Sequence, residues 1–167
     1  MPDVKRCAVV GVGNVLMGDD GVGVAAVEAM RSAGADDVLC LDAGTALFAV
    51  LPQVADCERV IIVDSVRAGS PPGSVYRIRL NVLDGATWAP SAGVSAHDLA
   101  VLPSLQQHAL AFGWRPETIL VGVEPQVTDF CSGMSDAVRD ALPKVVEIVR
   151  GEVARTRLLK PVPEETR

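Results

Sequence analysis

Short apolar runs alternate with segments of helical periodicity along most of this chain, and no other feature limits the possible folds as strongly. The first run, Cys7–Val12, stops at a glycine and predicts a buried strand. Similar runs predict strands over residues 38–41, 59–63, 74–80 and 118–123. Strands that alternate with helices predict a mostly parallel sheet with helices on both faces. The polar residues at the carboxyl ends of the strands are therefore the first place to search for a functional site.

The segments between the strands carry apolar residues at helical spacing, which predicts helices over residues 21–32, 45–54, 102–112 and 133–150. Thr45 is expected to cap the second helix, and Pro103 suits the first turn of the third. We predict that residues 1–150 form a single domain. Because residues 151–167 are charged and contain proline, we expect a frayed tail there.

Composition argues against several classes of protein. A chain of 167 residues, 49% of them apolar, can bury one full core, and aromatic residues make up only 4%, so aliphatic side chains must fill it. The net charge of −6 argues against nucleic acid as a partner, because phosphate binding needs a basic surface. No run approaches the roughly 18 apolar residues of a transmembrane helix, and the first residues lack a signal-peptide pattern. We therefore expect a cytoplasmic protein with no membrane partner.

The turn after the first strand, GVGN at residues 11–14, comes close to a dinucleotide-binding fingerprint but departs from it. Leu16 stands where that fingerprint requires its third glycine. Asp19 and Asp20 begin the following helix, where their carboxylates would repel a phosphate. Nucleotide binding, for which Asp42 would be the ribose-binding acid, is therefore the weakest function considered, and a nucleotide titration would test it.

Three residues predicted at the carboxyl edge of the sheet form a candidate metal site. Asp20 lies at the start of the first helix, Asp64 ends the third strand, and His97 follows a loop rich in glycine and proline. Two carboxylates and one imidazole suit a divalent first-row metal and leave coordination positions open. Asp19, by contrast, is most simply explained as a helix cap. The other histidine, His108, lies within a predicted helix away from this edge and receives no role.

The candidate residues lie in segments that resemble a known family. Residues 11–23, with the sequence GVGNVLMGDDGVG, are similar to the opening signature of the hydrogenase maturation endopeptidases. Further matching segments follow in the family's order: DAGT at 42–45, VIIVD at 60–64, SAH at 95–97 and VGVEP at 121–125. The resemblance covers residues 8–149 and implies a three-layer α/β/α sandwich. Residues 128–131 match no family motif, and substrate choice is expected to depend on such segments.

The resemblance also implies a function. Proteins of this family remove a C-terminal extension from the large-subunit precursor of a nickel–iron hydrogenase after nickel has been inserted. Carried over residue by residue, the family's catalytic and metal-binding residues are Asp20, Asp64 and His97. Nickel held by the precursor would be bound by these side chains, so that only a loaded precursor is recognised. Either a water activated by the metal or a carboxylate acting as general base would hydrolyse the peptide bond.

A second class of function would use the same residues. A nickel-handling or hydrogenase-binding chaperone without peptidase activity would keep both the ligands and the docking surface. A change in the mass of the precursor on incubation would distinguish a peptidase from such a chaperone.

The turns beside the candidate site are expected to form the substrate cleft. Gly13 and Asn14 follow the first strand, and Asp42, Gly44 and Thr45 lie at the end of the second. Because glycine has no Cβ atom, we interpret Gly13 and Gly44 as positions where the substrate chain can approach the backbone closely. The expected lining is completed by the loop over 81–96 and the strand end at 123–125.

Overall fold

A five-stranded sheet forms the centre of the molecule, with the strand order β2-β1-β3-β5-β4. The computed structural model describes residues 6–35, 37–82, 100–114 and 116–158. The strands are β1 (Cys7–Val12), β2 (Leu39–Gly44), β3 (Arg59–Ser65), β4 (Val75–Leu80) and β5 (Glu117–Val123). Strands β1, β2, β3 and β5 are parallel, and β4 pairs antiparallel with β5 at one edge. The prediction of a mostly parallel sheet is therefore confirmed.

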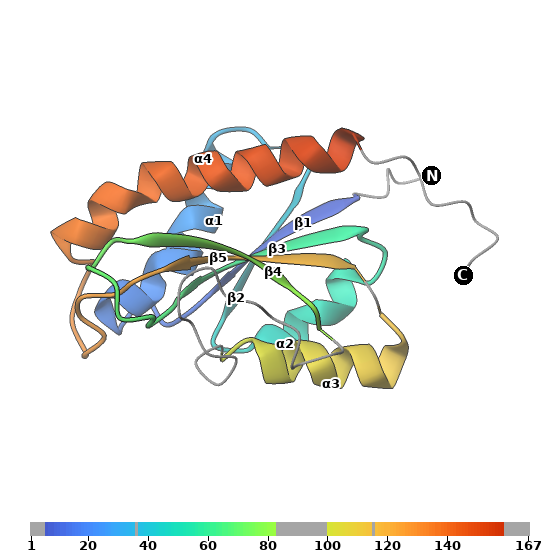
Figure 1. The fold of residues 1–167 in the computed structure, drawn as a ribbon, viewed down its shortest axis with the longest axis horizontal. Helices are drawn as coiled ribbons and strands as arrows, with labels where there is room; N and C mark the ends of the chain where they lie inside the picture. The colour runs from blue at the N-terminus through green and yellow to red at the C-terminus, as the bar shows by residue number, and fades with distance from the viewer. Residues whose placement is uncertain (1–5, 36, 83–99, 115, 159–167) are drawn as a thin grey trace.

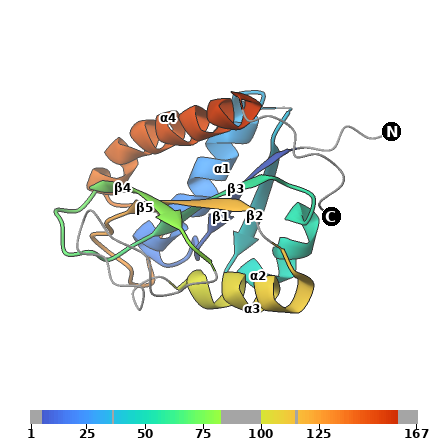
Figure 2. The ribbon, with the colours of Figure 1, turned by 45° about the vertical axis from the view of Figure 1, so that its right-hand side comes forward.

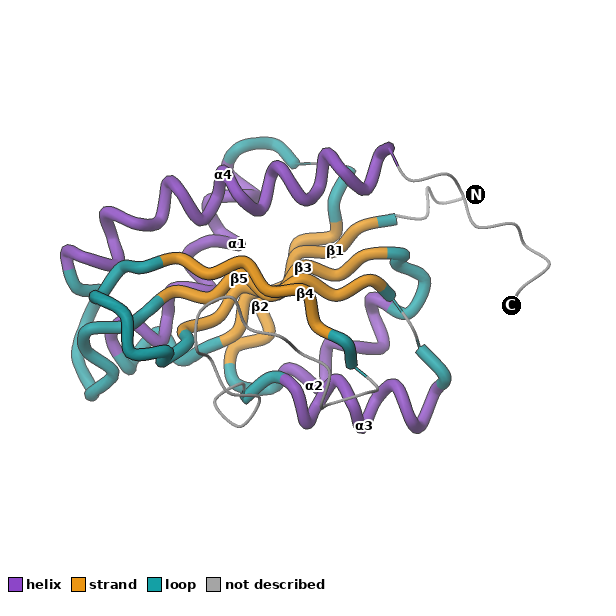
Figure 3. The backbone as a smooth tube through the Cα atoms, in the orientation of Figure 1, coloured by secondary structure: helices purple, strands orange, loops and turns teal. Residues whose placement is uncertain are grey.

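Helices cover both faces of this sheet, which makes the fold a three-layer α/β/α sandwich (Figures 1 and 2). On one face lie α1 (Val22–Ser32) and α4 (Asp136–Leu158). On the other lie α2 (Leu47–Val50), which the 3-10 turn η2 (Leu51–Val54) continues, and α3 (Leu102–Phe112). The tube drawing shows the strands between these two helix layers (Figure 3). No helix in the described part of the chain is long and apolar enough to cross a membrane.

Each face of the sheet has its own aliphatic core. Along β3, Val60 and Ile62 pack with α2 and α3, whereas Ile61 and Val63 pack with α1 and α4. All four side chains are fully buried. A parallel strand covered on both faces has no polar side, so it appears in the sequence as a continuous apolar run. This is why the central strands could be located from the sequence.

Strand β4 alternates between buried and exposed residues, as the sequence predicts for a strand with one solvated face. Ile78 belongs to the core shared with α2 and α3, while Arg77 and Arg79 lie on the opposite face. Arg77 reaches α4 there, where its Nε donates to Glu152 at 2.6 Å. The polar face of the edge strand is thus used to hold the last helix.

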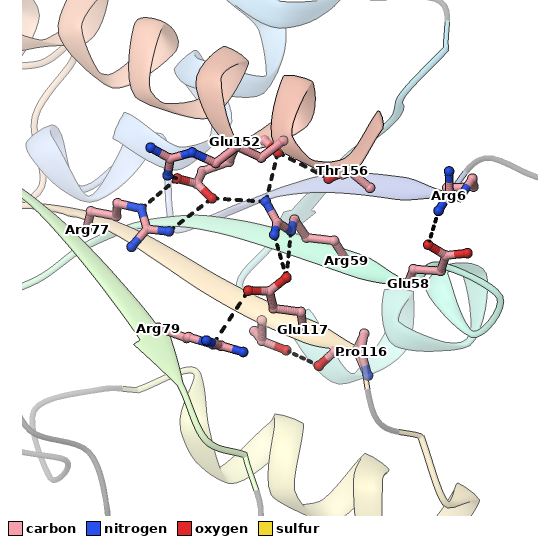
Figure 4. Close-up of polar contacts among 11 residues, drawn as sticks. Arg6, Glu58, Arg59, Arg77, Arg79, Pro116, Glu117, Glu152 and Thr156 are labelled. Atoms are coloured by element: carbon pink, nitrogen blue, oxygen red, sulfur yellow. Dashed lines mark hydrogen bonds and ion pairs between the residues drawn. The ribbon is translucent and has the colours of Figure 1, made fainter. Parts of the chain in front are cut away.

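Glu152 is the centre of an ion-pair cluster between α4 and the sheet (Figure 4). Its side chain is 2% exposed, and its carboxylate pairs with Arg59 at 3.1 Å, with Arg77 and with Arg155. Arg59 also pairs with Glu117 at the start of β5. Burial opposes ionisation of Glu152, but the hydrogen bond from Arg77 and the three positive charges outweigh it and lower the pKa of Glu152. A buried charge is tolerated only when it is paired in this way.

Three local predictions from the sequence are wrong. Residues 151–158 are not frayed, because α4 continues to Leu158 and Glu152 fastens its last turns to the sheet, and the rest of the predicted tail, 159–167, lies outside the described residues. Helix α4 also begins at Asp136, later than the predicted residue 133. Thr45 does not cap α2, whose N-cap residue is Ala46 and has no side-chain cap.

We predict that Glu152→Ala lowers the free energy of unfolding by about 3–5 kcal/mol, the usual cost of removing one partner from a buried ion pair. The change leaves Arg59, a residue that is 4% exposed, without its carboxylate partner on α4, although its bond to the residue-152 carbonyl can remain. Urea unfolding would measure the effect. Glu147→Ala, at an exposed position of the same helix, is the control and should change stability little. Equal stability of the two variants would contradict the structural importance of the cluster.

Candidate active site at the carboxyl edge of the sheet

The parallel strands bring Asp20 and Asp64 together at the carboxyl edge of the sheet. Asp64 is the last but one residue of β3, opposite Gly122 of β5. Asp20 lies in η1 (Gly18–Gly21), a 3-10 turn that connects β1 to α1. The residue after Asp64 contacts both acids, since the Ser65 hydroxyl donates to Asp20 Oδ1 at 2.8 Å and its amide donates to Asp64 Oδ1 at 2.8 Å. Ser65 therefore links the two carboxylates.

Ser65 was not among the residues predicted from the sequence. The available signal was a hydroxyl residue directly after a strand-terminal acid, which is too common to single out. Its importance comes from a contact across 45 residues of sequence. The structure therefore adds a positioning residue between two acids that were already candidates.

The Asp20 carboxylate is held in place from two sides. The Asn14 amide donates to Asp20 Oδ2 at 2.8 Å, and Ser65 holds Oδ1. The tight turn that permits this depends on Gly13, which has a φ of +130°. A Cβ atom on Gly13 would lie 1.7 Å from the Asp20 carbonyl oxygen.

The glycines after β1 therefore make close approaches to the protein's own backbone, as expected of glycines that shape the turn, and substrate contact at Gly13 stays a prediction. Gly11 behaves similarly, since a Cβ atom there would lie 2.2 Å from the Gly23 carbonyl oxygen in α1. The amides of this turn are also occupied: Gly13 donates to the Gly44 carbonyl at 2.8 Å and Asn14 donates to Asp20. A phosphate would lose the backbone donors it needs here, which further disfavours nucleotide binding.

Asp64 is in an environment that disfavours its charged form. Its residue is 6% exposed. Burial first, and then the negative charge of Asp20, raise the pKa of Asp64 to about 7, against the smaller opposing effect of the Ser65 amide. Two carboxylates so placed need a proton or a cation to relieve their repulsion. This is an electrostatic reason to regard the pair as a functional site.

Asp19 has a different role from the helix cap that was expected. It is fully buried, and η1 has no side-chain cap. Its carboxylate accepts the backbone amides of Gln126 at 2.7 Å, Val127 at 2.9 Å and Ser135 at 2.7 Å. Burial opposes ionisation, but these hydrogen bonds outweigh it and lower the pKa of Asp19. Asp19 thus holds the connection between β5 and α4 against the turn that carries Asp20.

Glu124, in the segment after β5 that was expected to line the cleft, holds another connection. Its buried carboxylate accepts the Tyr76 hydroxyl at 2.6 Å and the Ala68 amide at 2.8 Å. Burial opposes ionisation, but the hydrogen bonds from Tyr76 and from the 68–70 backbone lower the pKa of Glu124. Glu124 therefore fixes the chain that follows β3 and Asp64.

The turn at the end of β2 lies directly beside Gly13. Asp42 is exposed, and its Oδ1 accepts the Gly44 amide at 2.8 Å. The Gly44 carbonyl in turn accepts the Gly13 amide, which brings both predicted cleft segments together. Gly44 has a φ of +50°, and a Cβ atom placed on it would meet no atom within 4 Å, so the space beside this residue is open. Thr45 is exposed beside it.

His97, the third candidate ligand, lies outside the described residues. Within the described ranges no three His, Cys, Asp or Glu side chains gather as a metal site. His108 lies on α3, 3% exposed, with its ring centroid 4.7 Å from that of Phe112 and 5.3 Å from that of Trp114. It lines a cavity of about 570 Å³ formed with residues that precede β3 and β5. That is the amino edge of the sheet, opposite Asp20 and Asp64.

The chain matches a known protein family over most of its length. The family model described as hydrogenase maturation protease matches residues 24–152. The chain belongs to the hydrogenase maturation protease family. It is therefore a protease, as the resemblance of its motifs implied. The match spans Asp64 at the end of β3 and the segment after β5, and it begins after the turn that carries Asp19 and Asp20.

Individual relatives place the chain within this family. It is 31% identical over 150 residues to the hydrogenase expression/formation protein HupD of Rhizobium leguminosarum bv. viciae, covering 87% of this chain and 73% of that protein. A hydrogenase 2 maturation peptidase from a Thaumarchaeota archaeon has 33% identity and a TM-score of 0.70, covering 90% of this chain and 99% of that one. The E. coli hydrogenase maturating endopeptidase HybD has 25% identity and a TM-score of 0.72, covering 90% and 93%.

We predict that Asp64→Asn stabilises the metal-free protein at pH 8, by an amount on the order of a few kcal/mol, and has little effect near pH 4. The folded-state pKa of Asp64 is raised from 3.8 to about 7, so the wild type loses stability as the pH rises through that interval. Asparagine cannot ionise and removes this loss. Urea unfolding at several pH values would measure the difference.

Asp140→Asn is the matched control for this experiment, because Asp140 is an exposed carboxylate of α4. It should leave the pH dependence of unfolding unchanged. If Asp64→Asn had the same pH dependence as the wild type, the Asp64 carboxyl would not be destabilised by burial and by Asp20.

Proposed function

We propose that this protease removes the C-terminal extension of a nickel–iron hydrogenase large-subunit precursor after nickel insertion. The observation that carries the proposal is the pair of carboxylates, Asp20 and Asp64, linked by Ser65 at the carboxyl edge of the sheet. Membership of the hydrogenase maturation protease family supports the choice of substrate.

The same pair supports a metal-dependent reaction. Asp20 and Asp64 repel each other when both are ionised, and a divalent cation between them would relieve that repulsion. With His97 as a third ligand, the donor set of two oxygens and one nitrogen suits a first-row metal such as nickel. We propose that this nickel arrives with the precursor and is therefore part of the substrate. The ion would supply Lewis-acid chemistry at the site.

Each acid has a distinct role in this proposal. Asp20 is fixed by Asn14 and Ser65, so it is suited to orienting the nickel-loaded substrate. Asp64 would either bind the cation with Asp20 or act as general base on the attacking water, because a carboxylate bound to a divalent cation has its pKa lowered and no longer takes up a proton near neutral pH. His97 would be the third ligand of the metal. Asp42, Gly44 and Thr45 lie beside Gly13 and would contact the polypeptide next to the scissile bond.

Incubation of the purified chain with the large-subunit precursor should convert the precursor to a shorter product when nickel is loaded, and mass spectrometry would measure the change. The nickel-free precursor should remain intact. Asp20→Asn should reduce the rate by at least about 100-fold, because an uncharged amide neither attracts nor orients the cation well. Tight binding of the loaded precursor with no change in its mass would instead favour the non-proteolytic chaperone.

The two histidines provide a direct test of the third ligand. His97→Ala should abolish processing, because it removes the nitrogen donor. His108→Ala should leave processing within a few-fold of the wild type at a temperature where both variants are folded, because His108 lies at the opposite edge of the sheet. Cleavage rates together with melting curves would separate loss of the ligand from loss of the fold. Equal loss of cleavage in both folded variants would contradict the assignment of His97.

A further inference from the structure

Among the described residues, Leu158 is exposed at the end of α4, and the other large exposed apolar side chains lie in two places. Phe48, Leu110 and Phe112 lie on α2 and α3. Four others lie on the connections at the carboxyl edge, and we call them the apolar rim: Val15, Leu16, Val127 and Phe130, which are 54%, 57%, 36% and 80% exposed. Adjacent exposed apolar residues often mark an interaction surface.

The two segments that carry the rim lie side by side although they are distant in sequence. Met17 and Cys131 form an isolated parallel bridge, and the Cys131 amide donates to the Leu16 carbonyl at 3.1 Å. In that pairing the preceding residues, Leu16 and Phe130, are neighbours. The Asp19 amide donates to the Val127 carbonyl at 2.8 Å, which fixes the second segment close to the first.

The rim is also held in place before any partner binds. The buried Asp19 carboxylate accepts the amides of Val127 and Ser135, on both sides of Phe130. A surface already fixed by such bonds loses less conformational entropy on binding than a free loop does. The exposure of Phe130 is therefore a property of an ordered segment.

The rim is continuous with the candidate active site. The Asn14 amide, one residue before Val15, donates to the Asp20 carboxylate. The Val15 backbone packs closely against Gly21, the residue after Asp20. A Cβ atom added to Gly21 would lie only 3.0 Å from Val15 Cα. A polypeptide whose scissile bond lies at Asp20 and Asp64 must therefore pass beside the rim.

We infer that the apolar rim is the docking surface for an apolar patch on the folded hydrogenase large-subunit precursor, adjacent to the extension that is cleaved. The inference rests on the proposed function, because it takes the precursor as the occupant. A second copy of this chain is a less suitable occupant, since a partner covering the rim would crowd the edge that a protein substrate must reach. The rim would determine which precursor is bound, while the acids act on the metal and the peptide bond.

The chain offers a matched pair of double variants as a test. Leu16→Ser/Phe130→Ser removes the two most exposed side chains of the rim, and Leu110→Ser/Phe112→Ser removes the same residue types from α3, where they are 77% and 67% exposed. Melting curves would confirm that both variants are folded. The dissociation constant of the nickel-loaded precursor, measured by titration, and its cleavage rate at saturation would then be compared with the wild type.

The rim variant should bind the precursor at least about tenfold more weakly, as expected for loss of apolar contact residues, and should cleave it at nearly the wild-type rate at saturation. The α3 variant should match the wild type in both measurements. Equal affinity of all three proteins, or equal weakening in both variants, would overturn the inference. So would a wild-type dimer that dissociates only in the rim variant while precursor affinity is unchanged.

Failure of the proposed function would look different. If the wild type bound the precursor through the rim but never shortened it, the docking surface would stand and the peptidase assignment would fail. If the wild type cleaved the precursor and the rim variant bound it normally, the peptidase assignment would stand and the rim would have no role in docking.

Discussion

The buried carboxylate of Asp19 is the interaction on which the arrangement of the functional edge depends. It joins the turn after β1 to the connection between β5 and α4 through three backbone amides and the Ser135 hydroxyl. These two segments are more than 100 residues apart in sequence, as the separation of Asp19 from Gln126 shows. A buried carboxylate is costly unless its oxygens accept hydrogen bonds, and here those bonds fix the backbone on both sides of the candidate site.

Two adjacent acids, Asp19 and Asp20, therefore serve different purposes because successive side chains of a 3-10 turn point in different directions. Asp19 faces inward to backbone donors, and they lower its pKa. Asp20 is half-buried and lies close enough to Asp64 to raise the pKa of that carboxyl. Asp19 thus positions the candidate site residue Asp20, and replacement of either would affect the same edge for different physical reasons.

The sequence was sufficient to predict the sheet, because strands such as β3 are buried on both faces and appear as uninterrupted apolar runs. It also placed Asp20 and Asp64 at one edge, since parallel strands end together. It did not predict the role of Asp19, the link through Ser65 or the helical turns after Gly151. Each of these depends on a contact between distant segments, such as the pairing of Arg59 with Glu152. Local patterns carry no information about such pairs.

The buried carboxylates of this protein differ in how fully neighbouring groups compensate their charge. That difference distinguishes the carboxylates that hold the fold together from the candidate site residue Asp64. Glu152 is surrounded by guanidinium groups, and Glu124 by a hydroxyl and backbone amides, so the pKa of each is lowered. Asp64 is also buried, but the charged group that acts on it within the described part of the chain is another acid, and its pKa is raised. Glu152, Glu124 and Asp64 are all buried. Asp64 differs from the two glutamates because neighbouring groups within the described part of the chain do not fully compensate its charge. A cation delivered by the substrate would supply that compensation, and the site would then be electrostatically complete only when the loaded precursor is bound.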